Sequence, residues 1–164
     1  MTSTGRESKL DYGLVWSDML KLTKKADYGL IALRHLALSD GSASVKEIAA
    51  GYGIPMSLLA KVLQKLAKAG LLTAALGTNG GYRLARDARK ISALEVVRTI
   101  DGPIILTSCF TQHGQCGQSV KCSVREPLRK IHEGILSLLE NISIHEIAQE
   151  AGVADSELTI LRTL

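Results

Sequence analysis

Residues 53–72 read GIPMSLLAKVLQKLAKAGLL and carry a clear helical pattern. Large apolar residues recur here at the i, i+3, i+4, i+7 spacing of a helix face that packs against a core. They are Leu59, Val62, Leu63 and Leu66. At about 100° per residue, a polar and basic face lies on the opposite side of the same helix. It comprises Ser57, Lys61, Gln64 and Lys68. Pro55 fits the start and Gly70 the end, so we expect a helix over residues 56–69.

Two shorter patterns predict helices before this one. The first helix runs from Thr23 to about Leu38, with the Thr23 side chain as its N-cap. The second begins after Ser44, and Glu47 lies three residues later, which is the pattern of a capping box. Residues 51–54 then form a turn. A helix, a tight turn and a second helix with a basic outer face form a helix-turn-helix unit, whose second helix reads DNA.

A glycine-rich turn, GTNGG at residues 77–81, separates two short segments, 71–76 and 82–85. Such segments around a tight turn predict a β-hairpin. A hairpin directly after a reader helix is the wing of a winged helix. Gly80 and Gly81 would let the backbone approach a phosphate or enter a minor groove, and Arg83 would supply positive charge. The alternative is an ordinary surface hairpin, which the preceding helices make the poorer interpretation.

Charge is unevenly distributed along the chain. The net charge is +4, but residues 19–90 carry 12 Lys and Arg against 4 Asp and Glu, whereas residues 91–164 carry 6 against 9. A basic amino-terminal half favours a polyanion reader that is followed by a regulatory or assembly region. No acid–base pair, nucleophile–base arrangement or phosphate loop is evident, so we do not expect an enzyme.

The sequence does not have the pattern of a membrane protein. No apolar run approaches the ~20 residues needed to span a bilayer, and the polar amino terminus does not resemble a signal peptide. We therefore expect a cytoplasmic protein without a membrane partner or a small-molecule substrate.

All three cysteines fall within fourteen residues, with six and then five residues between Cys109, Cys116 and Cys122. A cytosolic setting disfavours a disulfide framework, so this cluster indicates metal or redox chemistry. Soft thiolates select iron–sulfur clusters, zinc or cuprous ions, but structural zinc more often shows two CxxC pairs. Three thiolates leave one position of an iron–sulfur cluster for another ligand. His113 inside the loop and Glu126 just after it are candidates for that position.

Helices are expected on both sides of the cysteines. One covers residues 91–100, with Ser92 as its cap. After Glu126 and Pro127, apolar residues alternate at spacings of three and four, the a/d rhythm of a coiled-coil seam. They are Leu128, Ile131, Ile135, Leu138 and Ile142. The seam favours a homodimer, and the alternative is packing on the chain's own core. Ser143 is expected to cap a last short helix.

These elements predict a mainly α fold with a small β-hairpin wing: a winged helix-turn-helix followed by a long dimerisation helix. We expect a flexible amino-terminal arm at residues 1–18 and a winged-helix DNA-binding domain at 19–90. The cysteine loop and dimerisation helices would occupy 91–150, and a carboxy-terminal tail 151–164.

Four stretches together resemble the Rrf2 family of bacterial winged-helix regulators, which includes IscR, NsrR and RirA. These are LTKKADYGL at 22–30, GIPMSLLAKVLQKLAKAGLL at 53–72, GTNGGYRLA at 77–85 and the three-cysteine loop. The resemblance covers roughly residues 19–150 and is greatest to regulators of the SUF iron–sulfur assembly operon. It implies a homodimer on a pseudo-palindromic operator, with each reader helix in a major groove and each wing in the adjacent minor groove.

The resemblance also implies which residues contact DNA. By position, phosphates would be held by Thr23, Lys24, Lys25 and Tyr28. Base edges would be met by Pro55, Ser57, Leu58 and Lys61. The other DNA-binding candidates in the reader helix and the wing are Gln64, Lys65, Lys68, Gly80, Gly81 and Arg83. Phosphate contacts set register and salt-dependent affinity, whereas base-edge contacts carry sequence preference.

For the cysteines, the resemblance implies an iron–sulfur cluster, with [2Fe-2S] favoured over [4Fe-4S]. IscR-type proteins place a histidine ligand three residues after the last cysteine, but Arg125 stands there and cannot ligate iron. NsrR-type proteins take an aspartate from the first helix of the partner, and Asp27 occupies that position. Asp27 of the partner subunit is therefore the leading fourth-ligand candidate, ahead of His113 and Glu126.

The sequence thus predicts a DNA-binding transcriptional repressor that senses iron–sulfur cluster status or redox or nitrosative stress and controls SUF assembly genes. One alternative is a DNA-binding repressor whose cysteines sense oxidation directly, without a cluster. Another is a small iron–sulfur electron carrier. A winged helix and a basic charge excess have no use in a carrier.

Overall fold

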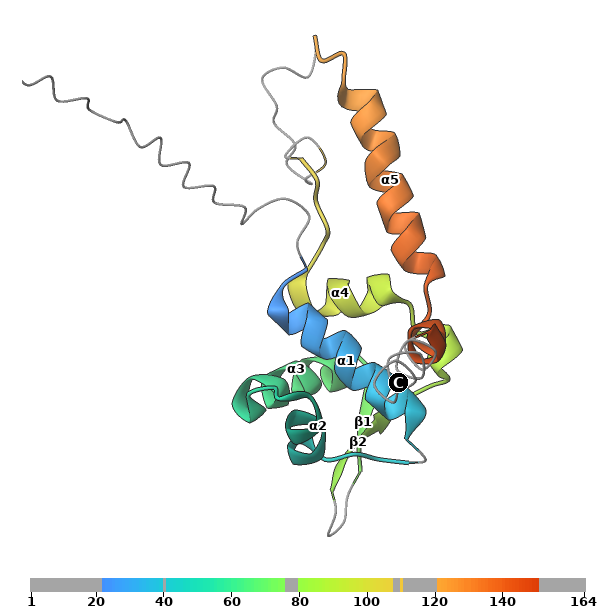
Figure 1. The fold of residues 1–164 in the computed structure, drawn as a ribbon. Coiled ribbons are helices and arrows are strands. Elements are labelled where there is room, and N and C mark those ends of the chain that lie inside the picture. Colours follow the sequence, from blue (N-terminus) through green and yellow to red (C-terminus); the bar gives the residue numbers. More distant parts are fainter. Residues whose placement is uncertain (1–21, 40, 76–79, 108–109, 111–120, 151–164) are drawn as a thin grey trace, which may run out of the picture.

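A computed structural model describes residues 22–39, 41–75, 80–107, 110 and 121–150. Along the chain they form the elements α1 (Lys24–Leu38), α2 (Val45–Tyr52), α3 (Met56–Lys68), β1 (Leu72–Ala75), β2 (Gly81–Leu84), the 3-10 helix η1 (Ala88–Lys90), α4 (Ala93–Asp101) and α5 (Arg125–Asn141). Residues 144–150 are also helical. Figure 1 shows α1 to α4 and the hairpin gathered together, with α5 extending away from them. The predicted winged helix-turn-helix is confirmed.

The first two helices begin at the caps that the sequence predicts. Thr23 Oγ1 accepts a hydrogen bond from the backbone N–H of Ala26 at 3.2 Å. Ser44 and Glu47 form the full capping box, because each side chain accepts a hydrogen bond from the backbone N–H of the other. Such a cap typically contributes about 1 kcal/mol. At the other end of α2, Gly53 adopts a φ of 63°, the left-handed conformation that ends helices and favours glycine.

The core lies where α3 packs under α1 and α4. All four apolar residues predicted for the inner face of α3 are buried, each at most 3% exposed. Burial of a Leu or Val side chain contributes roughly 1.5–3 kcal/mol. Helices α1 and α4 cross closely at Gly29, because a Cβ there would lie 2.3 Å from Cδ1 of Ile100. This crossing fixes how α4 sits on the helix-turn-helix.

The hairpin is fastened to the chain segment just before α2. Strands β1 and β2 are antiparallel, with Leu72 opposite Leu84. Two further hydrogen bonds join Ala43 and Tyr82, Ala43 N to Tyr82 O at 3.0 Å and Tyr82 N to Ala43 O at 2.9 Å. A Cβ at Gly81 would lie 2.3 Å from the Ala43 carbonyl oxygen. Glycine at position 81 therefore allows the backbone of β2 to pass close to the backbone of residues 43 and 44. The turn residues 76–79 lie outside the described residues.

Helix α5 begins and ends at other residues than those that the sequence pattern predicts. It begins at Arg125, and Pro127 fits its first turn because the N–H groups there have no partner within the helix. It ends at Asn141, so Ile142 lies just beyond the helix that the predicted seam assigned to it. The reason is a tie to the start of α4: Ile142 O accepts from Ala93 N at 2.8 Å, and Ile144 N donates to Ile91 O at 2.9 Å.

Ser92 and Ser143 cap the helices that follow them, as predicted. Ser92 Oγ accepts from Glu95 N, and Ser143 Oγ accepts from Glu146 N, both at 3.2 Å. The predicted arm at 1–18 and the whole of the predicted tail at 151–164 lie outside the described residues. Within the described segments, no helix combines the length and apolar character needed to cross a membrane.

Replacing Gly81 with alanine should loosen the wing. The added Cβ meets backbone atoms of residues 43 and 44, which cannot rotate away as a side chain can. We expect a loss of about 1–3 kcal/mol and a fall in Tm of roughly 3–10 °C by differential scanning calorimetry. Gly51→Ala is the matched control, because a Cβ there meets nothing within 4 Å. An unchanged Tm for Gly81→Ala would contradict the crossing.

Candidate DNA-binding surface and cysteine region

The outer face of α3 carries the side chains expected of a reader helix. Every residue of the predicted polar face is exposed: Ser57, Lys61, Gln64 and Lys68. In the part of the chain that the structure describes, neither Lys61 nor Lys68 forms an ion pair. Of the other two predicted base-edge residues, Pro55 is exposed just before α3 and Leu58 is half-buried in its first turn. The helix therefore presents ammonium, amide and hydroxyl groups to a partner.

The first turn of α1 is a second basic site. Thr23, Lys24 and Lys25 are exposed, whereas Tyr28 is half-buried against the core. Lys24 Nζ lies 3.5 Å from Oδ2 of Asp27, an exposed pair that solvent screens. Backbone N–H groups and the positive end of the helix dipole also favour an anion here.

The wing contributes one exposed cation. The guanidinium of Arg83 donates through Nε to Oγ1 of Thr73, 3.2 Å away on the neighbouring strand. This bond holds the Arg83 side chain against the outside of the hairpin. Gly80 is exposed beside it.

Lys65 has a contact that the sequence analysis did not anticipate. Its Nζ donates to the backbone carbonyl of Ile100, in the last turn of α4, at 2.9 Å. On a helix wheel, Lys65 lies roughly 70° from the middle of the polar face, toward the buried side. That flank position is the one signal in the sequence that separates Lys65 from the fully outward lysines of α3.

Of the three cysteines, Cys122 is the one that the structure describes. It is half-buried and lies just before α5. Cys109, Cys116 and His113 lie outside the described residues. Among the residues that are described, no three metal-ligating side chains gather.

The segment leading to the cysteines runs along α5. Phe110, which follows Cys109 in the sequence, stacks on the His132 ring with centroids 5.1 Å apart. Its backbone N–H donates to the Thr107 carbonyl at 3.1 Å. Two buried polar atoms of this region, Thr107 Oγ1 and His132 Nδ1, have no hydrogen-bond partner among the residues that the structure describes. In Figure 1 this segment passes from the end of α4 toward the far end of α5.

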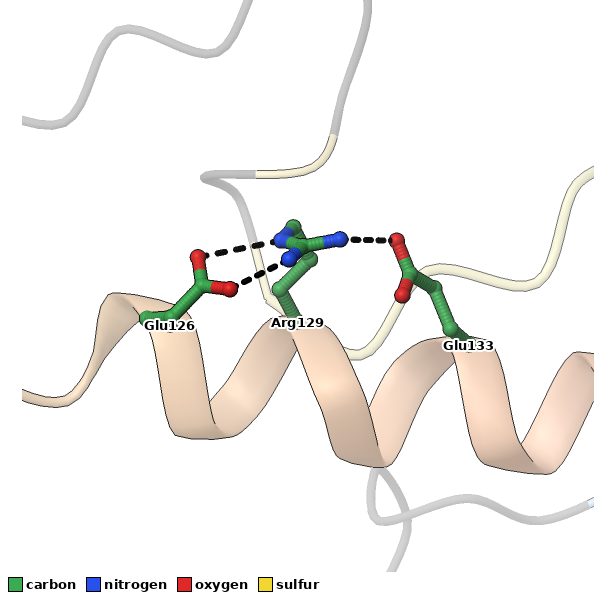
Figure 2. A network of polar contacts seen from close by, with 3 residues as sticks. All are labelled: Glu126, Arg129 and Glu133. Carbon is green, nitrogen blue, oxygen red and sulfur yellow. Dashed lines mark hydrogen bonds and ion pairs between the residues drawn. The ribbon is translucent and has the colours of Figure 1, made fainter.

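Glu126 is already bound within its own helix. Arg129 donates to it twice, with Nε to Oε2 at 3.0 Å and Nη2 to Oε1, and donates through Nη1 to Glu133 at 2.5 Å. Figure 2 shows the guanidinium lying between the two carboxylates. The hydrogen bond from Arg129 holds the pKa of Glu126 below its ordinary value. To bind a metal, this carboxylate would have to leave Arg129.

The sequence of the chain matches one protein family whose members are DNA-binding regulators. The model of Rrf2, described as iron-dependent transcriptional regulators, matches residues 22–150. The chain belongs to the Rrf2 family. Members of this family are transcription factors, so this Rrf2 protein is a transcriptional regulator and not an enzyme.

Solved structures of named regulators share the fold. CymR, the global cysteine regulator of B. subtilis, is 27% identical over 80% of this chain and 98% of its own, with a TM-score of 0.68. IscR of T. potens is 27% identical over 80% of this chain and 88% of its own, with a TM-score of 0.64. Oxidised S. aureus CymR, 24% identical over 79% of this chain and 96% of its own, shares the fold at a TM-score of 0.61.

Removing the Lys61 side chain should weaken DNA binding and relax its sequence preference. The probe is the duplex that the wild-type protein selects from random sequences, and fluorescence anisotropy measures the affinity. For Lys61→Ala we expect a loss of roughly 5- to 100-fold. Lys130→Ala removes the same charge from α5 and should leave the affinity within about two-fold. Equal losses in the two variants would contradict a specific role for Lys61.

Proposed function

We propose that this Rrf2 regulator represses transcription by binding operator DNA as a homodimer, with α3 in the major groove and the hairpin as the wing. The observation that carries this proposal is the outer face of α3. Its exposed Lys61, Gln64 and Lys68 lie on the side opposite a fully buried apolar face. Lysine and amide side chains on the exposed face of such a helix are suited to phosphates and base edges.

The apolar seam of α5 supports the homodimer. None of its residues is buried, and Ile131 and Leu138 are 52% and 61% exposed. Leu128, Ile135 and Ile142 are half-buried, so the chain's own core covers this face only in part. Ile131 and Leu138 remain accessible to a partner. A second copy of α5, with the same a/d pattern, is the occupant that the sequence favours.

For the cysteines, we propose that Cys109, Cys116 and Cys122 hold an iron–sulfur cluster, with [2Fe-2S] favoured over [4Fe-4S]. Three soft thiolates suit such a group. The unpartnered Thr107 Oγ1 and His132 Nδ1 fit it too, because a bound cluster offers sulfur acceptors to buried polar groups. When bound, the cluster would supply a redox- and iron-sensitive state, and SUF assembly genes are the proposed targets.

Asp27 of the partner subunit remains the proposed fourth ligand. The side chain of Asp27 is 47% exposed, and its ion pair is a 3.5 Å contact with Lys24, whose side chain is 74% exposed. Glu126, in contrast, is held by Arg129 through both oxygens. An aspartate at the start of the DNA-facing helix α1 would link the cluster's state to DNA binding.

A second candidate function is direct thiol sensing without a cluster. The similarity to CymR, which is described as a cysteine regulator, favours keeping it. The thiol-sensing function differs from the cluster-sensing function in one measurable respect: the reduced protein would hold no iron.

Anaerobic purification should give a brown protein with iron and acid-labile sulfide. Cys122→Ser should lose most of both while keeping its far-ultraviolet circular dichroism spectrum. Asp27→Ala should alter the visible spectrum, whereas Glu126→Gln, whose parent carboxylate is engaged by Arg129, should not. A colourless, iron-free wild-type protein would overturn the cluster and support thiol sensing. An unchanged Asp27→Ala spectrum would overturn the fourth-ligand assignment alone.

A charge in the α5 seam should separate the subunits. Leu138→Glu places a carboxylate where two apolar side chains would meet, and we expect monomers by sedimentation velocity at micromolar concentration. Ser137→Glu adds the same charge one residue away, off the seam, and should remain dimeric. Monomeric wild-type protein, or dissociation by both variants alike, would refute the proposed interface.

A further inference from the structure

The last turn of α4 contacts both of the helices that are proposed to face DNA. Lys65 of α3 donates to the Ile100 carbonyl at 2.9 Å. Thr23 at the start of α1 donates twice to Asp101, through Oγ1 to Oδ1 at 2.6 Å and through its backbone N–H to Oδ2 at 3.3 Å. Residues 100 and 101 therefore form a polar joint between α1, α3 and α4. Figure 1 shows the end of α4 beside the start of α1.

The charges at this joint are complementary. The last carbonyls of a helix lack intrahelical partners and carry partial negative charge. In α4, one of them is satisfied by the Lys65 ammonium. The Asp101 carboxylate faces the positive end of α1, where a negative group is favoured. No part of this arrangement involves a residue of the α5 seam.

Thr23 donates both its hydroxyl hydrogen and its backbone N–H to Asp101. Its hydroxyl oxygen also accepts from Ala26 N at 3.2 Å. Because a hydroxyl has one hydrogen to donate, Thr23 Oγ1 can donate to one acceptor at a time. A DNA phosphate that binds Thr23 must therefore replace the carboxylate. Asp101 and a phosphate are alternative anions for the same pair of donors.

The joint is continuous with the chain that follows it. The Ile100 side chain is buried, and a Cβ on Gly29 would lie 2.3 Å from its Cδ1 and 3.5 Å from Val62 and Val96. Directly after Asp101 the chain turns at Gly102, with a φ of 87°, and leads to Phe110 beside α5. Residues 102–107 are therefore joined directly to the turn that Thr23 and Lys65 hold.

We propose that Asp101 and Lys65 are positioning residues that couple the segment leading to Cys109 to α1 and α3, with Asp101 competing against a DNA phosphate for Thr23. The inference rests on the proposed DNA-binding role of α1 and α3 and does not require a cluster. The coupling free energy between two sites is the same in both directions. DNA binding therefore shifts the conformational equilibrium of residues 102–107 by the same factor by which that conformation shifts the DNA affinity.

The first test uses reduced, metal-free full-length protein without DNA. Hydrogen exchange is followed in the first turn of α1 and in residues 102–107 for Asp101→Asn and for Lys65→Met. Both regions should exchange faster in both variants, by about five-fold or more. Glu95→Gln and Lys130→Met are the matched controls and should leave both regions unchanged. Faster exchange in α1 alone would overturn the coupling.

The second test measures affinity for the duplex that the wild-type protein selects. Asp101→Asn should bind about five-fold or more tightly, whereas Glu95→Gln, with the same change of charge, should not. In wild-type protein, DNA should alter the alkylation rate of Cys109, and in Asp101→Asn it should not. Equal tightening in both acid-to-amide variants, or an unaltered wild-type alkylation rate, overturns the proposal. If no duplex is selected, the proposed function fails, and the exchange experiment still decides the coupling.

Discussion

The close crossing of α1 and α4 at Gly29 is the constraint on which the arrangement of the other elements depends. A Cβ there would lie 2.3 Å from Cδ1 of Ile100, so a larger residue at position 29 would require the Ile100 side chain to move. The crossing brings the end of α4 to the start of α1 and to the flank of α3. The buried face of α3 then completes the core, and its polar face is left outward. Apolar contacts thus hold the surfaces that are proposed to face DNA in a fixed relation.

Much of this fold could be predicted because its signals are local. A capping box spans four residues, and the inner face of α3 repeats within eight, so Ser44, Glu47 and Leu59 identify their own roles. The contacts of Lys65 and Thr23 could not be predicted in this way. Their partners lie 35 and 78 residues away, at positions that only the packing of α4 brings near. Gly81 is similar, because its neighbour Ala43 belongs to another part of the chain.

The cysteine region shows a different limit of sequence reasoning. Three thiolates in fourteen residues indicate soft-metal or redox chemistry, but spacing does not choose a fourth ligand. Membership of the Rrf2 family leaves the sensed signal open as well, because the similar structures include both a cysteine regulator and an IscR. The structure adds the ion pair that engages Glu126 and the stacking of Phe110 on His132. The same helix, α5, therefore carries the apolar seam and the contacts of the cysteine region.

The different strengths of these contacts explain how one molecule can be both rigid and responsive. Each buried Leu or Val in α3 contributes roughly 1.5–3 kcal/mol, and several act together. A single hydrogen bond contributes about 1 kcal/mol net, because water or another anion replaces a lost partner. Exchanging Asp101 for a phosphate at Thr23 therefore leaves the helices folded. The winged helix stays intact while the joint at the end of α4 changes partners, and residues 102–107 follow that joint.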